Sequence, residues 1–146
     1  MLNFFSNNNT NELILYNNIL LLSRNKIFYT KFDLADTFQN RINLIFMHIS
    51  FIFIKIKQKK DNKVFKVFQQ RLFDLIFNKI EVNMREIGYG DVSVNKKMKF
   101  LVKSFYNILL KCENFKKQSK ETKESFFSEY LEMNNNDKKH DYIGII

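Results

Sequence analysis

Few side chains in this sequence have the types and spacing that catalysis or metal binding requires. Its 146 residues include one cysteine and two histidines. A single cysteine excludes an intrachain disulfide and any cysteine-rich metal site. No nucleophile–base pair, haem-attachment C-x-x-C-H or glycine-rich phosphate-binding motif is visible, and the carboxylates are scattered among lysines. The sequence therefore predicts a protein that is not an enzyme and needs neither a cofactor nor a metal. The alternative is an enzyme whose active site is built from residues that are distant in the sequence.

The two residues that such chemistry would use first both fall on apolar helix faces. Cys112 lies on the apolar face of a predicted helix, which favours a buried, unreactive thiol. His48 lies within the apolar run 44–54. A lone histidine on such a helix is more often a hydrogen-bonded core residue than a ligand. We therefore expect structural roles for both.

The most distinctive stretch is Met84–Tyr106, MREIGYGDVSVNKKMKFLVKSFY, which holds two of the three glycines. Its apolar spacing predicts a helix, a tight polar turn and a second helix. Gly88 is placed to end the first helix, because glycine takes positive φ without steric cost. Asp91 is expected to accept a hydrogen bond from a nearby backbone N–H, and Ser93 or Asn95 to cap the second helix. On spacing alone, the turn is a connector. The two apolar stripes are Val64, Val67, Phe68, Leu72, Leu75, Ile76, Ile80 and Ile87, and then Met98, Leu101, Val102, Phe105, Leu109 and Cys112.

The core of the chain is predicted to form around a helix from Phe38 to Ile56, which Asp36 or Thr37 can cap. Residues 44–54 are apolar almost all round. Eleven helical residues reach only about 16 Å, whereas the hydrocarbon core of a membrane is about 30 Å thick. We therefore expect a buried central helix; the alternative is that part of its face is open and holds an apolar client. Its near-heptad seam consists of Phe38, Ile42, Ile45, Ile49, Ile52 and Ile56.

Shorter helices are expected on either side of the central helix. Thr10 or Asn9 can cap a first helix with a stripe from Leu13 to Ser23, and residues 27–32 form a short apolar turn. After Cys112, residues 113–124 are rich in lysine and either prolong the helix or form a linker. Aromatic and aliphatic residues within 126–133 predict a last helix that packs back on the others.

Length and composition favour one compact, all-α domain. A chain of 146 residues can bury a core without disulfides, and 45% hydrophobic with 27% charged residues is typical of a folded soluble protein. With no proline and three glycines, long breaks in backbone regularity are not expected. We predict a single-domain bundle of about five or six helices. It should span residues 13–133, with a frayed segment at 1–12 and a flexible tail at 134–146.

The formal net charge of +9 permits a nucleic acid or an anionic membrane as a partner. A composition rich in Asn, Lys, Ile and Phe, as an AT-rich genome favours, also accounts for excess lysine. Arginine is scarce, which makes nucleic-acid recognition a weaker interpretation. The basic segment after the central helix is either a solvated loop or a patch that lies against lipid headgroups, where each lysine adds about 1 kcal/mol. Its lysines are Lys55, Lys57, Lys59, Lys60 and Lys63.

Two separated stretches resemble the ubiquinol–cytochrome c chaperone family. MREIGYGDVSVNKKMKFLVKSFY is similar to the family segment REMGVGD…VPK…K…AFYG. FYTKFDLADTFQNRINLIFMHISFIFIKI, residues 28–56, is similar to the segment FY…GV.DT..GRFD…LH. The resemblance covers Leu13 to Cys112. Asn95 stands where the family usually has proline, Asn107 where it often has glycine, and Asn43 replaces a bulkier or acidic residue.

The resemblance implies an assembly chaperone for respiratory complex III that holds newly made cytochrome b. Holding such a client requires an apolar groove on a rigid helical scaffold. The implied partners are cytochrome b or another complex III component, an anionic membrane surface, and the small second factor with which some relatives act. Gly88, Gly90, Asp91, Phe105 and Tyr106 match the family motif and are the candidate partner-binding residues, and Arg85, Lys96 and Lys99 would orient an acidic partner segment or lipid.

Two other functions fit the same sequence. One is a basic helical module that binds nucleic acid, which the net charge motivates; the other is a structural protein whose central helix pairs with a second copy, which the near-heptad seam motivates. The first ten residues lack the patterns of a transit peptide and of a signal peptide. We therefore expect a protein of the bacterial cytoplasm, at the surface of the inner membrane, rather than one imported into the mitochondrial matrix.

Overall fold

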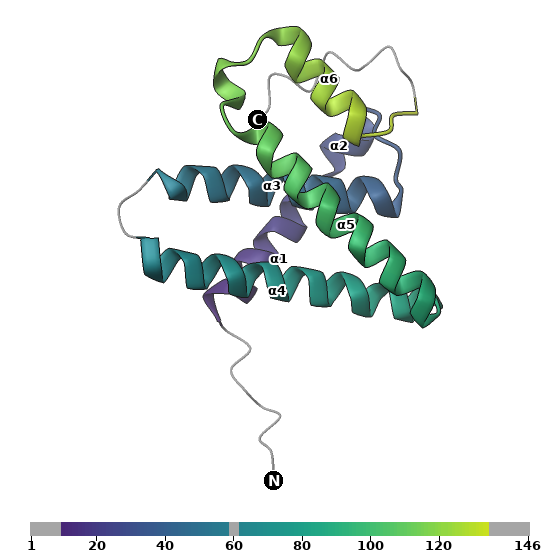
Figure 1. Cartoon of the computed structure of the whole chain (residues 1–146). Coiled ribbons are helices and arrows are strands. Elements are labelled where there is room, and N and C mark those ends of the chain that lie inside the picture. The colour runs from purple at the N-terminus through teal and green to yellow at the C-terminus, as the bar shows by residue number, and fades with distance from the viewer. Residues whose placement is uncertain (1–9, 59–61, 135–146) are drawn as a thin grey trace.

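The computed structural model describes residues 10–58 and 62–134, and within them the chain is built from helices (Figure 1). The one β-type contact in these ranges is an isolated bridge between Leu34 and Met133. The prediction of a single-domain, all-α helical bundle is therefore confirmed. The predicted frayed start and flexible tail lie largely outside the described residues. The elements are α1 (Asn11–Ser23), α2 (Lys26–Thr30), α3 (Phe38–Lys57), α4 (Asn62–Ile87), α5 (Asp91–Cys112), the 3-10 helix η1 (Phe115–Lys117) and α6 (Lys120–Tyr130).

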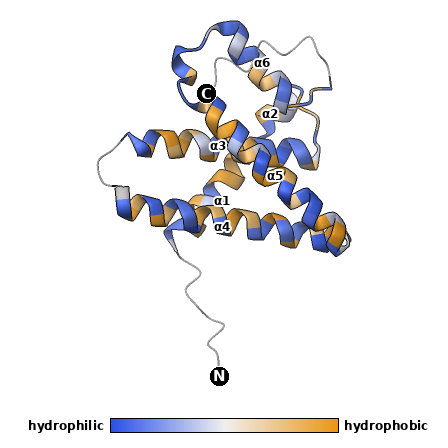
Figure 2. Ribbon diagram, in the orientation of Figure 1, coloured by the Kyte–Doolittle hydropathy of each residue, from blue (hydrophilic) through white to orange (hydrophobic). Residues whose placement is uncertain are grey.

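Helix α3 lies at the centre of the bundle. Figure 1 shows α1 behind it, α4 alongside and α5 crossing in front, and all three contact it. Residues 42–47 are all buried. The Phe46 ring stacks on Phe77 of α4, with ring centroids 5.5 Å apart, and meets Phe105 of α5 edge-on at 5.3 Å. In Figure 2 the apolar residues of α3 gather along its middle and its ends are polar. The expected buried central helix is confirmed.

The near-heptad seam of α3 forms part of this core. Ile42, Ile45 and Ile49 are buried against other helices of the same chain. These three positions are therefore not available to pair with a second copy of the chain. Further along, Ile52 and Ile56 are only half-buried. The cover over α3 therefore weakens toward its C-terminal end.

Two of the predicted helix caps are formed. The Thr10 hydroxyl accepts a hydrogen bond from the Leu13 N–H at 3.3 Å, and the Thr37 hydroxyl accepts one from the Asn40 N–H at 3.1 Å. Each bond satisfies one of the N–H groups that lack a partner in the first turn of a helix. Asp36, the other candidate cap for α3, instead pairs with Arg41.

The predicted stripe of α4 is partly wrong at its ends. Leu72, Ile76 and Ile80 are buried as expected, but Val64 and Val67 are exposed. At 3.6 residues per turn, these two valines point to the side of α4 opposite its buried residues. Ile87 is exposed as well, because it lies in the last turn, beyond the part of α4 that α3 and α1 cover.

Residues 113–124, after α5, neither prolong that helix nor form a linker without secondary structure. Helix α5 ends at Cys112, and Asn114 takes a left-handed backbone conformation with φ of 59°. This reversal directs Phe115 inward, where it is buried against Phe126 and Phe127 of α6 at ring distances of 5.7 and 5.9 Å. The expected last helix does pack back, and a single aromatic residue in the lysine-rich stretch anchors the turn.

The surroundings of Cys112 and His48 support a structural role for both residues. Cys112 is buried, and this burial raises the pKa of its thiol to about 12, so the reactive thiolate is disfavoured near neutral pH. The Nδ1–H of half-buried His48 donates to the Leu44 carbonyl at 2.7 Å, and its ring lies edge-on to Phe28 with centroids 6.2 Å apart. His48 is thus the hydrogen-bonded core residue that the sequence predicts.

Two buried asparagines of α3 fix the C-terminal segment in place. The Asn40 amide nitrogen donates to the carbonyls of Ala35 and Glu132, each at 2.7 Å, and its oxygen accepts from the Glu132 N–H at 2.9 Å. Asn43 donates to the Tyr130 carbonyl at 2.7 Å. The bonds to Tyr130 and Glu132 reach backbone groups more than 85 residues away in the sequence, and we call the two asparagines the asparagine clamp.

We predict that Asn40→Ala lowers the free energy of unfolding by about 2–4 kcal/mol, because it removes a buried amide that makes three hydrogen bonds and takes away the acceptor of the Glu132 N–H. Urea denaturation followed by circular dichroism measures this difference. Asn107→Ala, at an exposed position of α5, is the matched control and should stay within about 0.5 kcal/mol of the unmodified chain. Equal stability of the two variants would contradict the clamp.

Candidate functional site

The turn between α4 and α5 is closed by charge as well as by backbone geometry. Gly88 has φ of 108°, as predicted for the residue that ends α4. Arg85 forms ion pairs with Glu81, one turn earlier, and with Asp91 across the turn. Both carboxylates raise the pKa of the Arg85 guanidinium, so it keeps its charge. The motif residues before and after the turn therefore bind one another.

The predicted caps for α5 are wrong. The helix begins at Asp91, and its N-cap is Gly90, whose backbone is extended with φ of −73° and ψ of 164°. No side chain caps this end. Asp91 is already in the first turn, so its carboxylate pairs with Arg85 instead of a backbone N–H. Ser93 and Asn95 lie inside the helix, where a capping geometry is not available.

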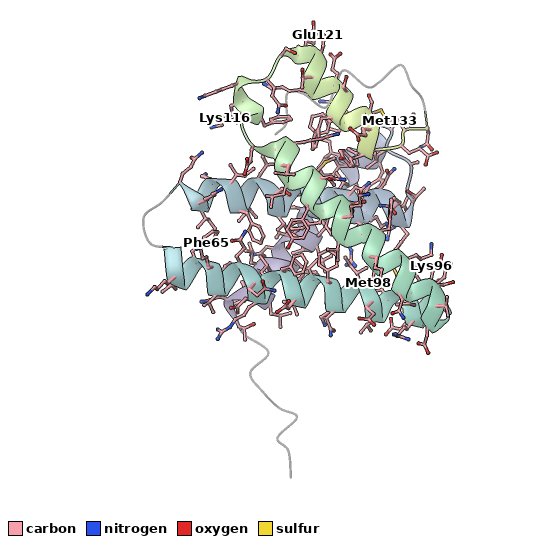
Figure 3. All side chains as sticks on the ribbon, in the orientation of Figure 1. Phe65, Lys96, Met98, Lys116, Glu121 and Met133 are labelled. Atoms are coloured by element: carbon pink, nitrogen blue, oxygen red, sulfur yellow. The ribbon has the colours of Figure 1, made fainter. Side chains whose placement is uncertain are left out.

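The basic residues of α5 lie on its solvent face. Lys96 and Lys99 are exposed, and Figure 3 shows Lys96 at the outer end of α5. Lys97 places its ammonium 4.8 Å from the centre of the Tyr89 ring, which holds the tyrosine of the turn against α5. Lys96 and Lys99 are accessible to an acidic partner, and this role stays a prediction.

A groove opens between α3, α4 and α5, at the end of the bundle far from the turn. It consists of two adjoining cavities of about 350 Å³ each, which share Phe53, Lys66, Gln69 and Leu109. In Figure 3, Phe65 extends from α4 toward α3, and its ring lies edge-on to Phe53 at 6.4 Å. The remaining lining residues are Ile54, Lys57, Phe65, Gln70, Phe73, Phe105, Tyr106 and Glu113. We call this feature the aromatic groove.

Tyr106 and Phe105 contribute to the aromatic groove in different ways. Phe105 is only 3% exposed, so it belongs to the core and lies beneath the groove as its floor. Its prediction as a surface residue for partner binding does not agree with this burial. Tyr106 is 51% exposed and forms a wall, with its ring 6.0 Å from Phe73 and 5.6 Å from Phe105. A partner can therefore reach Tyr106 directly.

The rim of the aromatic groove is polar and nearly neutral. Lys57 and Glu113 face each other across it, with Nζ and Oε1 3.7 Å apart. Both are largely exposed, so this pair contributes little to stability. Lys66, Gln69 and the neighbouring Gln70 supply hydrogen-bond donors along α4. The groove thus has an aromatic floor and a polar rim that water can hydrate. Grooves that hold the apolar face of a helix have the same combination.

The predicted basic patch is described only in part. Lys55, Lys57 and Lys63 are exposed, and Lys57 also borders the aromatic groove. Lys59 and Lys60 lie outside the described residues. A role for these lysines at a membrane surface stays a prediction.

The eight predicted partner-binding residues do not form one site. Arg85, Gly88, Gly90 and Asp91 form the turn, whereas Tyr106 lies 15 residues beyond Asp91, about 22 Å along α5. Sequence reasoning missed the side of the groove that α4 provides. One signal was available: Phe65, Gln69 and Phe73 recur every four residues, and Gln69 interrupts the apolar face where a neighbouring helix would pack.

The described residues contain neither a metal-binding cluster nor a membrane-spanning helix. Across residues 10–58 and 62–134, no three His, Cys, Asp or Glu side chains are grouped so that they could hold a metal ion. No helix in these ranges combines the length and the apolar character that crossing a membrane requires.

Comparison with known proteins gives a family and a related fold. The family described as ubiquinol-cytochrome C chaperone matches residues 30–124, well over half of the chain and all of α3, α4 and α5. No curated protein matches the chain. Among solved structures, the crystal structure of the Cbp3 homolog from Brucella abortus is similar, with a TM-score of 0.69 and 25% sequence identity. The match covers 82% of this chain. It covers 66% of the Brucella abortus chain, just under two thirds of the length of that protein.

We predict that the two glycines of the turn tolerate substitution differently. Gly88→Ala should lower the free energy of unfolding by about 1–2 kcal/mol, because a Cβ is strained at positive φ even though nothing crowds it. Gly90→Ser should be neutral or slightly stabilising, because its extended backbone suits a capping serine. Thermal denaturation of both variants tests this, and an equal loss of stability would contradict the turn geometry.

Proposed function

Because this chain belongs to the ubiquinol–cytochrome c chaperone family, we propose that it is a non-catalytic assembly chaperone for respiratory complex III, which holds newly made cytochrome b in its aromatic groove. The observation that carries the proposal is that Tyr106, a residue of the family motif, forms a wall of that groove. The fold relative from Brucella abortus supports the same scaffold.

The dimensions and chemistry of the aromatic groove support an apolar helical client. A total volume of several hundred Å³ accommodates a few large side chains from one helix face, spaced at i, i+3 or i+4 and i+7, but not a whole helix. The exposed ring of Tyr106 and the partly buried rings of Phe65 and Phe73 supply apolar area for contact with a client, and these rigid side chains lose little conformational entropy on binding. The polar rim keeps the empty groove compatible with water.

The turn and the solvent face of α5 are assigned a supporting role. Arg85 is engaged by Glu81 and Asp91, whereas the exposed lysines Lys96 and Lys99 form no ion pair within the described residues. These lysines would attract an acidic stretch next to the apolar client segment, or an acidic second assembly factor, before the groove engages it. A location at the inner surface of a bacterial membrane remains part of the proposal.

We predict that Tyr106→Ala reduces the amount of cytochrome b that co-purifies with the full chain from native membranes by at least about tenfold, as expected when an aromatic anchor is lost. Leu110→Ala is the matched control: Leu110 is also on α5 and exposed, but it does not line the groove. It should change recovery by less than about twofold.

Urea denaturation of both variants separates binding from folding, because Tyr106 also packs on two phenylalanines. Loss of cytochrome b with Tyr106→Ala at unchanged helicity would support the proposal. Unchanged recovery with Tyr106→Ala, or the same loss with Leu110→Ala, would contradict it.

A further inference from the structure

A further cavity lies at the corner where α1, α2 and the start of α3 meet. It has a volume of about 220 Å³ and is lined by Arg24, Lys26, Tyr29, Thr30, Asp36 and Arg41. Three of these six side chains are cations and one is an anion, so the lining carries a formal charge of +2. Two of the four arginines in the whole chain are here. The general excess of lysine does not account for a concentration of arginine.

The single carboxylate of this corner is already engaged. Asp36 accepts two hydrogen bonds from the Arg41 guanidinium, at 2.7 and 2.9 Å, and these bonds lower the pKa of the carboxyl. Within the described residues, Arg24 and Lys26 form no ion pair. The cavity therefore presents two uncompensated cations beside a paired guanidinium. Arginine and lysine so arranged are typical ligands of a phosphate group.

Two hydroxyl groups hold the corner together. The Tyr29 hydroxyl donates to the Ser23 carbonyl at 3.2 Å, and the Thr30 hydroxyl donates to the Lys26 carbonyl at 2.9 Å. Burial raises the pKa of Tyr29, so its hydroxyl stays protonated. The Tyr29 bond fixes α2 against the end of α1, and the Thr30 bond lies within α2. The cations therefore project from a backbone whose geometry is set before any ligand binds, which lowers the entropy lost on binding.

Exposed aliphatic side chains lie on the last turn of α1, which leads to Arg24. Leu21 is 69% exposed and Leu22 is 51% exposed, one turn before Arg24. Leu21 and Arg24 are three residues apart and so share a helix face, and Ile14 continues that face with 47% exposure. Large aliphatic residues next to an arginine and a lysine match the boundary of a bilayer, where acyl chains meet charged headgroups.

We propose that this corner binds the phosphate headgroup of an anionic phospholipid, with Arg24, Lys26 and Arg41 around the phosphate and Leu21 and Leu22 against the acyl chains. A single-stranded nucleic acid would instead require exposed aromatic rings for base stacking, and the exposed neighbours here are aliphatic. A free phosphate would leave the two leucines without a role.

The proposed lipid site is separate from the aromatic groove. Arg41 and Lys57 lie near opposite ends of α3, 16 residues and about 24 Å apart along the helix. It is also distinct from the predicted basic patch, which begins at Lys55. Loss of the lipid site should therefore leave client binding by the purified chain unchanged, so that each proposal can fail without the other.

The test is co-sedimentation of the full chain with vesicles of phosphatidylcholine alone or with 30% phosphatidylglycerol, roughly a physiological content of anionic lipid. The variant Arg24→Ala/Lys26→Ala should lose roughly 30-fold in partition coefficient on the anionic vesicles, since each basic residue contributes about fivefold. The control Lys116→Ala/Lys117→Ala removes the same charge from η1, where Figure 3 shows Lys116, and should lose at most about threefold. Leu21→Ser should weaken binding with the charges intact.

Each outcome of this experiment is decisive. A selective loss with the Arg24 and Lys26 variant, together with a loss on Leu21→Ser, would support the lipid site. Equal losses in both charge variants would assign binding to net charge alone and overturn it. The absence of binding to anionic vesicles would also overturn the lipid site. This holds whether or not inorganic phosphate or a single-stranded RNA oligonucleotide binds to the chain instead. Circular dichroism of each variant confirms that these exposed substitutions leave the fold intact.

Discussion

The structure depends on the need to cover a helix that is apolar nearly all round. Helix α3 has too many buried faces for any one neighbour, so α1, α4 and α5 enclose it from different sides. Burial of residues 42–47 is complete, whereas Phe51, Ile52 and Ile54 are only half-buried. Of these residues, Ile54 lines the aromatic groove, next to the buried Phe53. In this account the groove is a direct consequence of how the central helix is enclosed, and the proposed client completes that enclosure.

Two local devices determine where the cover is tight and where it opens. The asparagine clamp ties the end of α6 and the residues after it to the first half of α3, beside a cavity of about 720 Å³. The turn at Gly88 joins α4 to α5 and buries Met84 and Val94 beside it. From that junction α5 crosses the bundle obliquely, so the two helices diverge toward Phe65 and Leu109 (Figure 1). A rigid turn at one end is thus compatible with an accessible groove at the other.

Local signals in the sequence predicted the helices, the buried central helix and the glycine that ends α4, because each depends on nearby residues and on hydrophobic periodicity. The asparagine clamp could not be predicted, because a hydrogen bond between Asn40 and Glu132 leaves no pattern in the sequence near either residue. The role of Gly90 as N-cap was missed because Ser93 and Asn95 are better capping residues by type. Of the residues that line the aromatic groove, the prediction for partner binding included only Phe105 and Tyr106, which the family motif contains. Phe65 and Phe73 look like ordinary core residues until the divergence of the helices is known.

The central claim is that the aromatic groove holds the client, and site-specific photo-crosslinking tests it most directly. A photoreactive residue at Gln69, which lines both cavities of the groove, is compared in growing cells with one at Asn78, on the opposite side of α4. The account predicts an adduct with cytochrome b from position 69 and none from position 78. Equal adducts from both positions, or an adduct with cytochrome b from position 78 alone, would contradict it.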